Sequence, residues 1–165
     1  MNFHFRKRHE DDNAFMYAVW LRGQRNEGTN QFIGNKIYYA NLTDRIKPLI
    51  ERCQTIVVCN PDLHEQVYGF VCFEWLDSVC IIHYIHVKTP FRKMGVGKNL
   101  LTQANPRFGK EETVISFTNG FCSHRMSSYN LVFNPFVLDL LEEIRGKDNA
   151  TRSIVSKIAR TFGAG

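Results

Sequence analysis

The feature that most constrains this chain is an apolar stretch that ends in a basic, glycine-containing turn. Residues Val79 to Val87 are largely apolar on both alternating faces, a pattern typical of a strand covered on both sides of a sheet. Pro90 ends the stretch, because proline cannot donate to a strand ladder. The turn RKMGVGK follows from Arg92 to Lys98 and opens a helical segment. The sequence therefore predicts a strand, a turn and a helix at the centre of the fold.

This turn has the chemistry of a phosphate cradle. The start of a helix offers unpaired N–H groups and the positive end of the helix dipole. Gly95 and Gly97 allow a ligand to approach the backbone closely. Neither the P-loop pattern GxxxxGK[ST] nor the dinucleotide pattern GxGxxG is present. A plain strand-to-helix turn with solvated lysines is the alternative at this point.

Composition indicates one ordered globular domain spanning residues 1–165. The chain has 165 residues, 44% of them hydrophobic, and a net charge of +5, enough apolar content to bury a core. Residues 147–165 are expected to form a basic amphipathic C-terminal tail, which packs on the domain, mediates dimerisation or is partly disordered. No apolar run approaches the length of a membrane span, and no signal-peptide pattern opens the chain. We expect a monomer or a homodimer.

Five cysteines are present, an odd number without a CxxC pair. They lie mostly in apolar, strand-like runs, which is typical of reduced core thiols in a cytoplasmic protein. The histidines do not show zinc-ligand spacing relative to them, so we expect no metal.

The remaining pattern predicts about six strands with helices between them. Strands are expected over Phe3–Arg8, Gln54–Cys59, Val67–Leu76, Val79–Val87, Thr113–Phe117 and, as a strand or bend, Val132–Phe136. Helical spacing covers Ala14–Leu21 with a stop at Gly23, Phe32–Tyr39, Asp44–Cys53, Gly97–Leu101 and Val137–Arg145. Pro48 fits only near the start of its helix. Phe121–Tyr129 is read as a short helix or an irregular loop.

A two-residue turn at Asp77-Ser78 would join two of these strands into a hairpin. Its register pairs Glu74 with Ile81 and Cys72 with His83, so Glu74 and His83 share a face roughly 5–8 Å apart. Strand alternation then places Ile85 and Val87 on that same face, and Tyr84 and His86 on the other.

The central stretch resembles motif A of the GCN5-related N-acetyltransferases (GNAT), whose pattern is R/Q-x-x-G-x-G/A. Arg92-x-x-Gly95-x-Gly97 fits it without a mismatch. The resemblance implies an α/β fold of the α+β type, with a mixed, mostly antiparallel sheet of about six strands splayed between strands 4 and 5. It also implies acetyl-CoA as co-substrate. The implied cofactor-binding residues are Ile85, Val87, Arg92, Lys93, Met94, Gly95, Val96, Gly97 and Lys98.

The same resemblance implies direct acyl transfer to an amine, which needs a base, an oxyanion donor and an acid. His83 is the first candidate for the base, with Glu74 as the alternative base or as the group that orients His83. A core histidine and a solvated carboxylate are the structural alternatives. The backbone N–H of Ile85 or Val87 matches the oxyanion donor by position. Tyr129 is the candidate acid, although the glycine of the family's Y-x-x-x-G-F setting is missing.

The chain departs from the family after Asn119, where the family's last helix supports the pantetheine and the acceptor. Residues 120–136 look similar to small phage-type GNAT proteins, including relatives of the Mom DNA-modification acyltransferases. We therefore expect Ser123, His124 and Arg125 to contact the acceptor, and Tyr38 to line its site. Core packing is the alternative for Tyr38.

The sequence thus favours an acetyl-CoA-dependent N-acyltransferase acting on a small molecule, a protein or a nucleic acid. A Mom-like nucleobase or DNA-modifying acyltransferase is one alternative. A GNAT-fold protein that binds acyl-CoA without catalysis is the other.

Overall fold

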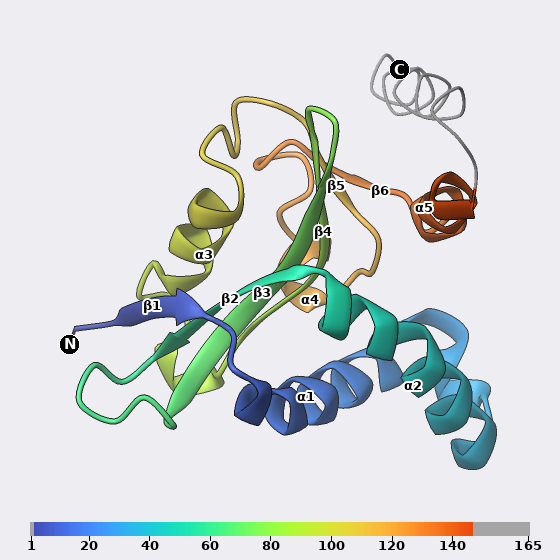
Figure 1. The fold of residues 1–165 in the computed structure, drawn as a ribbon, viewed down its shortest axis with the longest axis horizontal. Coiled ribbons are helices and arrows are strands. Elements are labelled where there is room, and N and C mark those ends of the chain that lie inside the picture. Colours follow the sequence, from blue (N-terminus) through green and yellow to red (C-terminus); the bar gives the residue numbers. More distant parts are fainter. Residues whose placement is uncertain (1, 147–165) are drawn as a thin grey trace.

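The structure is a computed structural model of the 165-residue chain, and it describes residues 2–146 (Figure 1). One six-stranded sheet organises this part of the chain, with its strands in sequence order from β1 to β6. The strands are β1 (His4–Lys7), β2 (Gln54–Cys59), β3 (Val67–Leu76), β4 (Val79–Val87), β5 (Thr113–Ile115) and β6 (Leu131–Phe133). The expected α+β fold with a mixed six-stranded sheet is confirmed.

The sheet changes character at β4. The first four strands pair antiparallel, whereas β4 pairs parallel with β5 through only two residues, Ile81 and Ile82. β6 continues the parallel half beside β5. The carboxyl-terminal half of β4 therefore extends beyond its neighbour, which is the splay that the family resemblance implied.

Five α-helices accompany the sheet in the described residues. They are α1 (Asn13–Arg25), α2 (Asn35–Arg52), α3 (Val96–Ala104), α4 (Gly120–Ser123) and α5 (Val137–Gly146). Short 3-10 turns precede α1, α2 and α3 at Glu10–Asp12, Gly28–Phe32 and Thr89–Phe91. Helix α3 packs on one face of the sheet, and α1 and α2 pack on the other (Figure 1).

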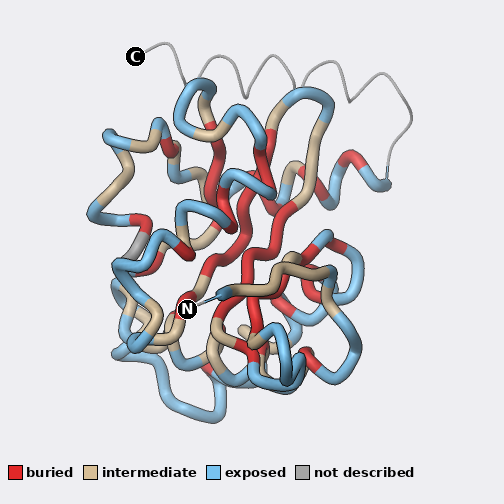
Figure 2. The backbone as a smooth tube through the Cα atoms, turned by 90° about the vertical axis from the view of Figure 1, so that its left-hand side faces the viewer, coloured by how far each residue is buried: buried red, intermediate tan, exposed pale blue. Residues whose placement is uncertain are grey.

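Buried residues concentrate in the central strands and on the helix faces that cover them (Figure 2). On the α3 side, Leu100 and Leu101 pack against Ile82 and Ile85. On the other side, Trp20 belongs to the cluster shared by α1, α2 and the sheet. β4 is thus covered on both faces, as its apolar pattern predicted.

A β-bulge in β4 corrects the predicted register. Glu74 pairs with Ile81 as expected, but the register shifts between Cys72 and Phe73, so that Cys72 pairs with Tyr84 instead of His83. The extra residue reverses the alternation beyond it, because a bulge places two residues opposite one. Ile85 consequently packs with the α3-side cluster and Tyr84 with the α1–α2 cluster. The prediction that Ile85 and Val87 share the face of His83 was wrong.

Two helix boundaries also differ from the prediction. Helix α1 runs through Gly23 to Arg25, and α2 runs unbroken from Asn35 to Arg52 with Pro48 inside it. Pro48 lacks the N–H that would bond to the preceding turn, yet Leu49 and Ile50 beside it are fully buried. Tertiary packing therefore overrides the local breaker signal.

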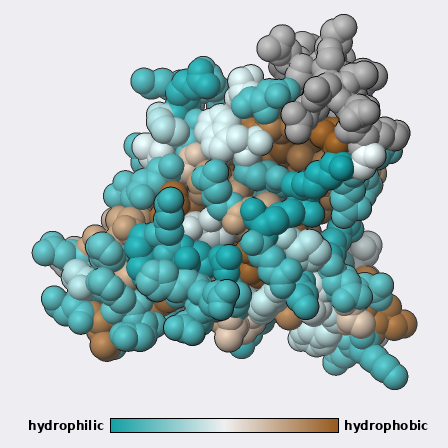
Figure 3. All heavy atoms as spheres, viewed as in Figure 1, coloured by the Kyte–Doolittle hydropathy of each residue, from teal (hydrophilic) through white to brown (hydrophobic). Residues whose placement is uncertain are grey.

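The face seen in Figure 3 is mostly hydrophilic, with small separate apolar areas, one of them near the beginning of α2. No helix within residues 2–146 is long and apolar enough to cross a membrane. The predicted amphipathic tail at 147–165 lies outside the described residues.

Candidate acyl-donor site

A pocket of about 820 Å³ opens where the end of β4 faces α1 and the start of α4. One end is basic and is lined by Lys88, Arg92 and Lys93, beside Gly97 in the first turn of α3. The other end is lined by Tyr84, Glu27, Asn119, Gly120 and Arg125. The pocket thus runs along the exposed edge of β4 from a cationic end to an end that contains a carboxylate.

The basic end is held by the turn that the sequence predicted. The Arg92 side chain donates from Nε to the carbonyl oxygen of Val87 over 2.9 Å, which folds the loop back onto the strand. Gly95 caps α3 in the left-handed conformation at φ 79°, which glycine adopts without steric cost. The free N–H groups of α3 and the three cations then favour a phosphate-bearing ligand at this end.

The splay next to β4 is spanned by one side chain. Asn119 donates from Nδ2 to the carbonyl oxygen of Ile85 over 2.7 Å, and its Oδ1 accepts from the backbone N–H of Cys122 at 3.1 Å. Because the N–H and C=O of one strand residue project from the same edge, the N–H of Ile85 also faces the splay. It is therefore placed to donate to an oxyanion formed there.

Two side chains of β4 line the pocket from the α1 side. Burial lowers the pKa of His86 to about 4, helped by the charges of Arg92 and Lys88, so this imidazole is neutral near pH 7. Burial raises the pKa of Tyr84, which stays a phenol. The Tyr84 ring stacks on Trp20 at 4.8 Å. A Cβ on Gly23 would lie 1.9 Å from the Tyr84 hydroxyl, so only glycine in α1 admits this ring.

The predicted cofactor-binding residues divide into two groups. Ile85, Val87, Arg92, Lys93 and Gly97 line the pocket. The other four lie around the turn: Val96 is buried in the core, Gly95 forms the helix cap, and Met94 and Lys98 are exposed.

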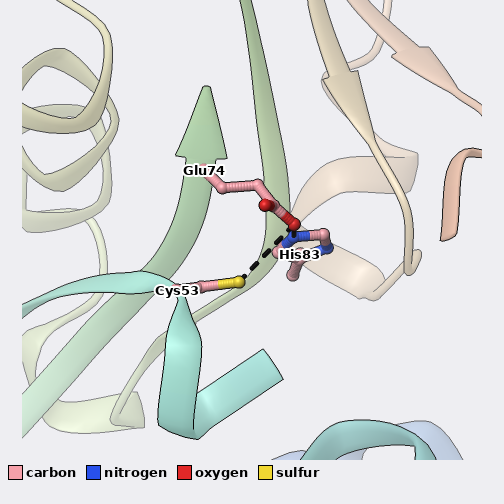
Figure 4. A group of neighbouring side chains, drawn as sticks. All are labelled: Cys53, Glu74 and His83. Atoms are coloured by element: carbon pink, nitrogen blue, oxygen red, sulfur yellow. Dashed lines mark hydrogen bonds and ion pairs between the residues drawn. The ribbon is translucent and has the colours of Figure 1, made fainter. Parts of the chain in front are cut away.

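His83 and Glu74 meet, but they lie outside the pocket. His83 is fully buried, and its Nε2 lies 2.7 Å from Oε1 of Glu74 (Figure 4). Its Nδ1 lies 2.7 Å from the Ser116 hydroxyl oxygen. Burial alone would lower the pKa of His83, but hydrogen bonds with Cys53 and Glu74 raise it. Burial alone would raise the pKa of Glu74, but His83 and Arg145 lower it. Their role as catalytic base stays a prediction.

The predicted acid and acceptor residues are dispersed. Tyr129 packs edge-to-face against Phe108 at 5.2 Å and does not line the pocket. Tyr38 is buried in α2 and donates its hydroxyl hydrogen to the carbonyl oxygen of Leu21 over 2.6 Å. Ser123 and His124 are exposed, whereas Arg125 lines the pocket.

Glu27 and Asn119 are two of the pocket residues that sequence reasoning missed. Glu27 lies in the connection between α1 and α2, which the sequence shows only as a polar loop. Asn119 precedes Gly120, and this pair on its own predicts only an ordinary turn. No local pattern marks either position, because long-range packing brings both to β4.

Comparison with solved structures supports the fold through one match. A protein assigned as an acetyl transferase from Pyrococcus furiosus superimposes with a TM-score of 0.53 at 18% identity, covering 89% of this chain and 93% of the other. Apo-form YjaB from Escherichia coli gives a TM-score of 0.45 at 20% identity over 63% of this chain, and the match spans 65% of YjaB. N-acetylglutamate synthase from Neisseria gonorrhoeae, solved with coenzyme A and N-acetyl-glutamate, gives 0.43 at 14% identity over 65% of this chain and 22% of that one.

A search of the curated proteins found no match. The family model of the acetyltransferase (GNAT) family matches residues 9–118, which is more than half of the chain. This segment contains both the splayed strand β4 and the turn at its end. The match confirms the predicted class of acetyl-CoA-dependent acyltransferases. The chain belongs to the acetyltransferase (GNAT) family.

Proposed function

We propose that this protein is an N-acetyltransferase that binds acetyl-CoA in the pocket along β4 and transfers the acetyl group to an amine. The observation that carries the proposal is the basic end of the pocket, where three cations meet the start of α3 at the end of a splayed strand. Acetyl-CoA supplies an activated thioester and an anionic pyrophosphate. Lys88, Arg92 and Lys93 hold the phosphates, and the N–H of Ile85 stabilises the oxyanion.

The opposite end of the pocket suits an amine. Glu27 presents a carboxylate beside Tyr84, which attracts the ammonium form of the acceptor and takes its proton before attack. Tyr84 is a phenol near this end and can return a proton to the leaving thiolate. Arg125 contributes the recognition of an anionic group on the acceptor.

Acetyl transfer to a panel of amines, followed by release of the CoA thiol, tests this proposal. We expect Glu27→Gln to lower kcat/KM by about 100-fold, while acetyl-CoA binding stays within threefold. Glu65→Gln is the matched control, because Glu65 is exposed and lies outside the pocket. Equal activity of the two variants would remove Glu27 from the mechanism. Absence of transfer to every amine, with binding intact, would favour the non-catalytic alternative.

A further inference from the structure

Cys53, Glu74 and His83 bring three different metal-ligating groups together on the α2 side of the sheet (Figure 4). Cys53 caps the end of α2, Glu74 lies on β3, and His83 occupies the bulge of β4. One ligand atom of each residue lies within 4.8 Å of the other two. The Cys53 sulfur lies 3.6 Å from Oε1 of Glu74, and Nε2 of His83 lies 2.7 Å from the same oxygen.

We propose that these three side chains form a binding site for a zinc-class divalent cation. A thiolate, an imidazole and a carboxylate together suit Zn²⁺ better than Mg²⁺ or Ca²⁺, which prefer oxygen ligands alone. Ligand bonds of about 2.0–2.3 Å in a tetrahedral site place ligand atoms about 3.3–3.6 Å apart. The Cys53–Glu74 separation already fits, and the His83–Glu74 separation must open by about 0.6 Å.

Glu74 and His83, the two proposed ligands that lie on the sheet, already have the supporting hydrogen bonds that metal ligands require. Ser116 is buried with its hydroxyl oxygen 2.7 Å from Nδ1 of His83, so it can accept a hydrogen bond from Nδ1–H in the tautomer that leaves Nε2 free to coordinate. Arg145 donates to Oε2 of Glu74, which fixes the carboxylate while Oε1 faces the cluster. Such partners hold the ring tautomer and the carboxylate orientation in metal sites.

Charge and access also suit a cation. Coordination displaces the Cys53 thiol proton to solvent, so the thiolate and the Glu74 carboxylate together balance the two positive charges. The Glu74 side chain is 16% exposed, whereas His83 is fully buried. The cluster therefore reaches solvent on the Glu74 side, where a water molecule completes four-coordination.

A purely hydrogen-bonded cluster would not need the thiol. Ser116 and Glu74 satisfy both nitrogens of His83, and Arg145 satisfies the second oxygen of Glu74. The Cys53 thiol donates a weak hydrogen bond to Oε1 of Glu74 over 3.6 Å, an oxygen that His83 already contacts at 2.7 Å, so the thiol adds a soft ligand rather than a required hydrogen-bond partner. A cation would instead tie the end of α2 to β3 and to the bulge of β4. The sequence could not suggest this site, because its ligands lie 21 and 9 residues apart without a motif.

Titration of chelator-treated, reduced protein with Co²⁺ tests the proposal without an activity assay. We expect one Co²⁺ per chain, with a thiolate-to-cobalt charge-transfer band and the visible bands of tetrahedral cobalt, and full displacement by Zn²⁺. Cys53→Ala should lose the thiolate band. Cys80→Ala is the matched control, because Cys80 is an equally buried thiol in the other core cluster, and it should keep the band.

Glu74→Gln provides a second variant whose side chain keeps its size, and it should weaken Co²⁺ binding by at least about tenfold. Zn²⁺ at 100 times its Kd should raise the ratio of folded to unfolded wild-type protein about 100-fold, seen as a higher Tm that Cys53→Ala does not show. A wild-type titration without a thiolate band, or a band that persists in Cys53→Ala, would overturn the proposal. Acetyl-CoA binding is expected to survive in Cys53→Ala, so this result is independent of the proposed enzymatic function.

Discussion

The two ends of the pocket are encoded in different ways. The turn at residues 88–97 follows a long strand, contains its own glycines and cations, and forms a helix start from residues close in sequence. The other end draws on the α1–α2 connection, the middle of β4 and the segment after β5. Local sequence therefore specifies the basic end, proposed to bind the acyl donor and called the donor end below. Long-range packing assembles the opposite end, proposed to bind the amine and called the acceptor end.

This difference has a consequence for function. In the proposed function the donor turn binds the phosphates of acetyl-CoA, a group that does not vary, so its chemistry fits in a short motif. The acceptor end is built from loops on a fixed scaffold, where binding specificity commonly resides. Variants at the two ends should therefore separate donor binding from transfer.

The largest separation is expected from charge reversal. Arg92→Glu combined with Lys93→Glu should weaken acetyl-CoA binding by about 100-fold, because two phosphate-facing cations become repulsive. Arg125→Glu should leave acetyl-CoA binding within threefold but abolish modification of the acceptor. Calorimetric titration and a transfer assay on each variant measure both effects. Loss of donor binding in Arg125→Glu would show that the two ends are not separable.

A smaller effect is expected at Asn119, which lies at the acceptor end and bonds to β4 across the splay. Asn119→Ala removes the bonds to the Ile85 carbonyl and the Cys122 N–H, leaving buried backbone groups unpaired at a cost of about 2–3 kcal/mol. Urea unfolding of the variant measures this change. A free energy of unfolding within 0.5 kcal/mol of wild type, roughly the scatter for neutral surface changes, would mean that the bridge does not hold the splay.

His86, which lines the pocket from the α1 side, should make stability depend on pH. Its folded pKa of about 4 lies below the unfolded value of 6.5, so the unfolded chain binds the proton more tightly. The contribution is complete above pH 6.5 and is lost as the pH falls from 6.5 towards 4. We expect a loss of about 1–2 kcal/mol over that interval, since the ring keeps some contact with solvent. Urea midpoints across this pH range should fall less steeply in His86→Gln, and parallel curves would refute the assignment.

The smallest effect belongs to a position outside both ends. Pro48→Ala restores an N–H inside α2, and we expect a gain of about 1 kcal/mol in the free energy of unfolding. The gain is reduced because proline also restricts the unfolded chain. Thermal unfolding measures it, with acetyl-CoA binding unchanged. Destabilisation by Pro48→Ala would mean that the ring contributes packing in the helix.

Most of the fold could be predicted because strand and helix periodicities are strong here. β2, β3 and β4 match their predicted ranges residue for residue. The bulge at Cys72/Phe73 could not be predicted, because no glycine or proline marks it and a single extra residue reverses the faces of the strand beyond it. Helix α1 passes Gly23 because that glycine serves the contact with Tyr84 rather than a helix end.

The candidate site was predictable only where the motif is local. Arg92 and Gly97 line the pocket as the resemblance implied. His83 and Glu74 were paired correctly in space, but the bulge and the surrounding core exclude them from the pocket. Glu27 lies in a polar loop whose position depends on how α1 packs, which sequence periodicity does not determine.

Calorimetric titration with acetyl-CoA tests the central claim most directly, using wild type, Gly97→Glu and the control Gly34→Glu. Gly97 lines the basic end of the pocket, whereas Gly34 is exposed with no atom within 4 Å of an added Cβ. We predict micromolar binding by wild type and Gly34→Glu, and its loss in Gly97→Glu, because a carboxylate then occupies the phosphate position. Equal binding by all three proteins, or none by wild type, would contradict the assignment of residues 88–97 as the donor site.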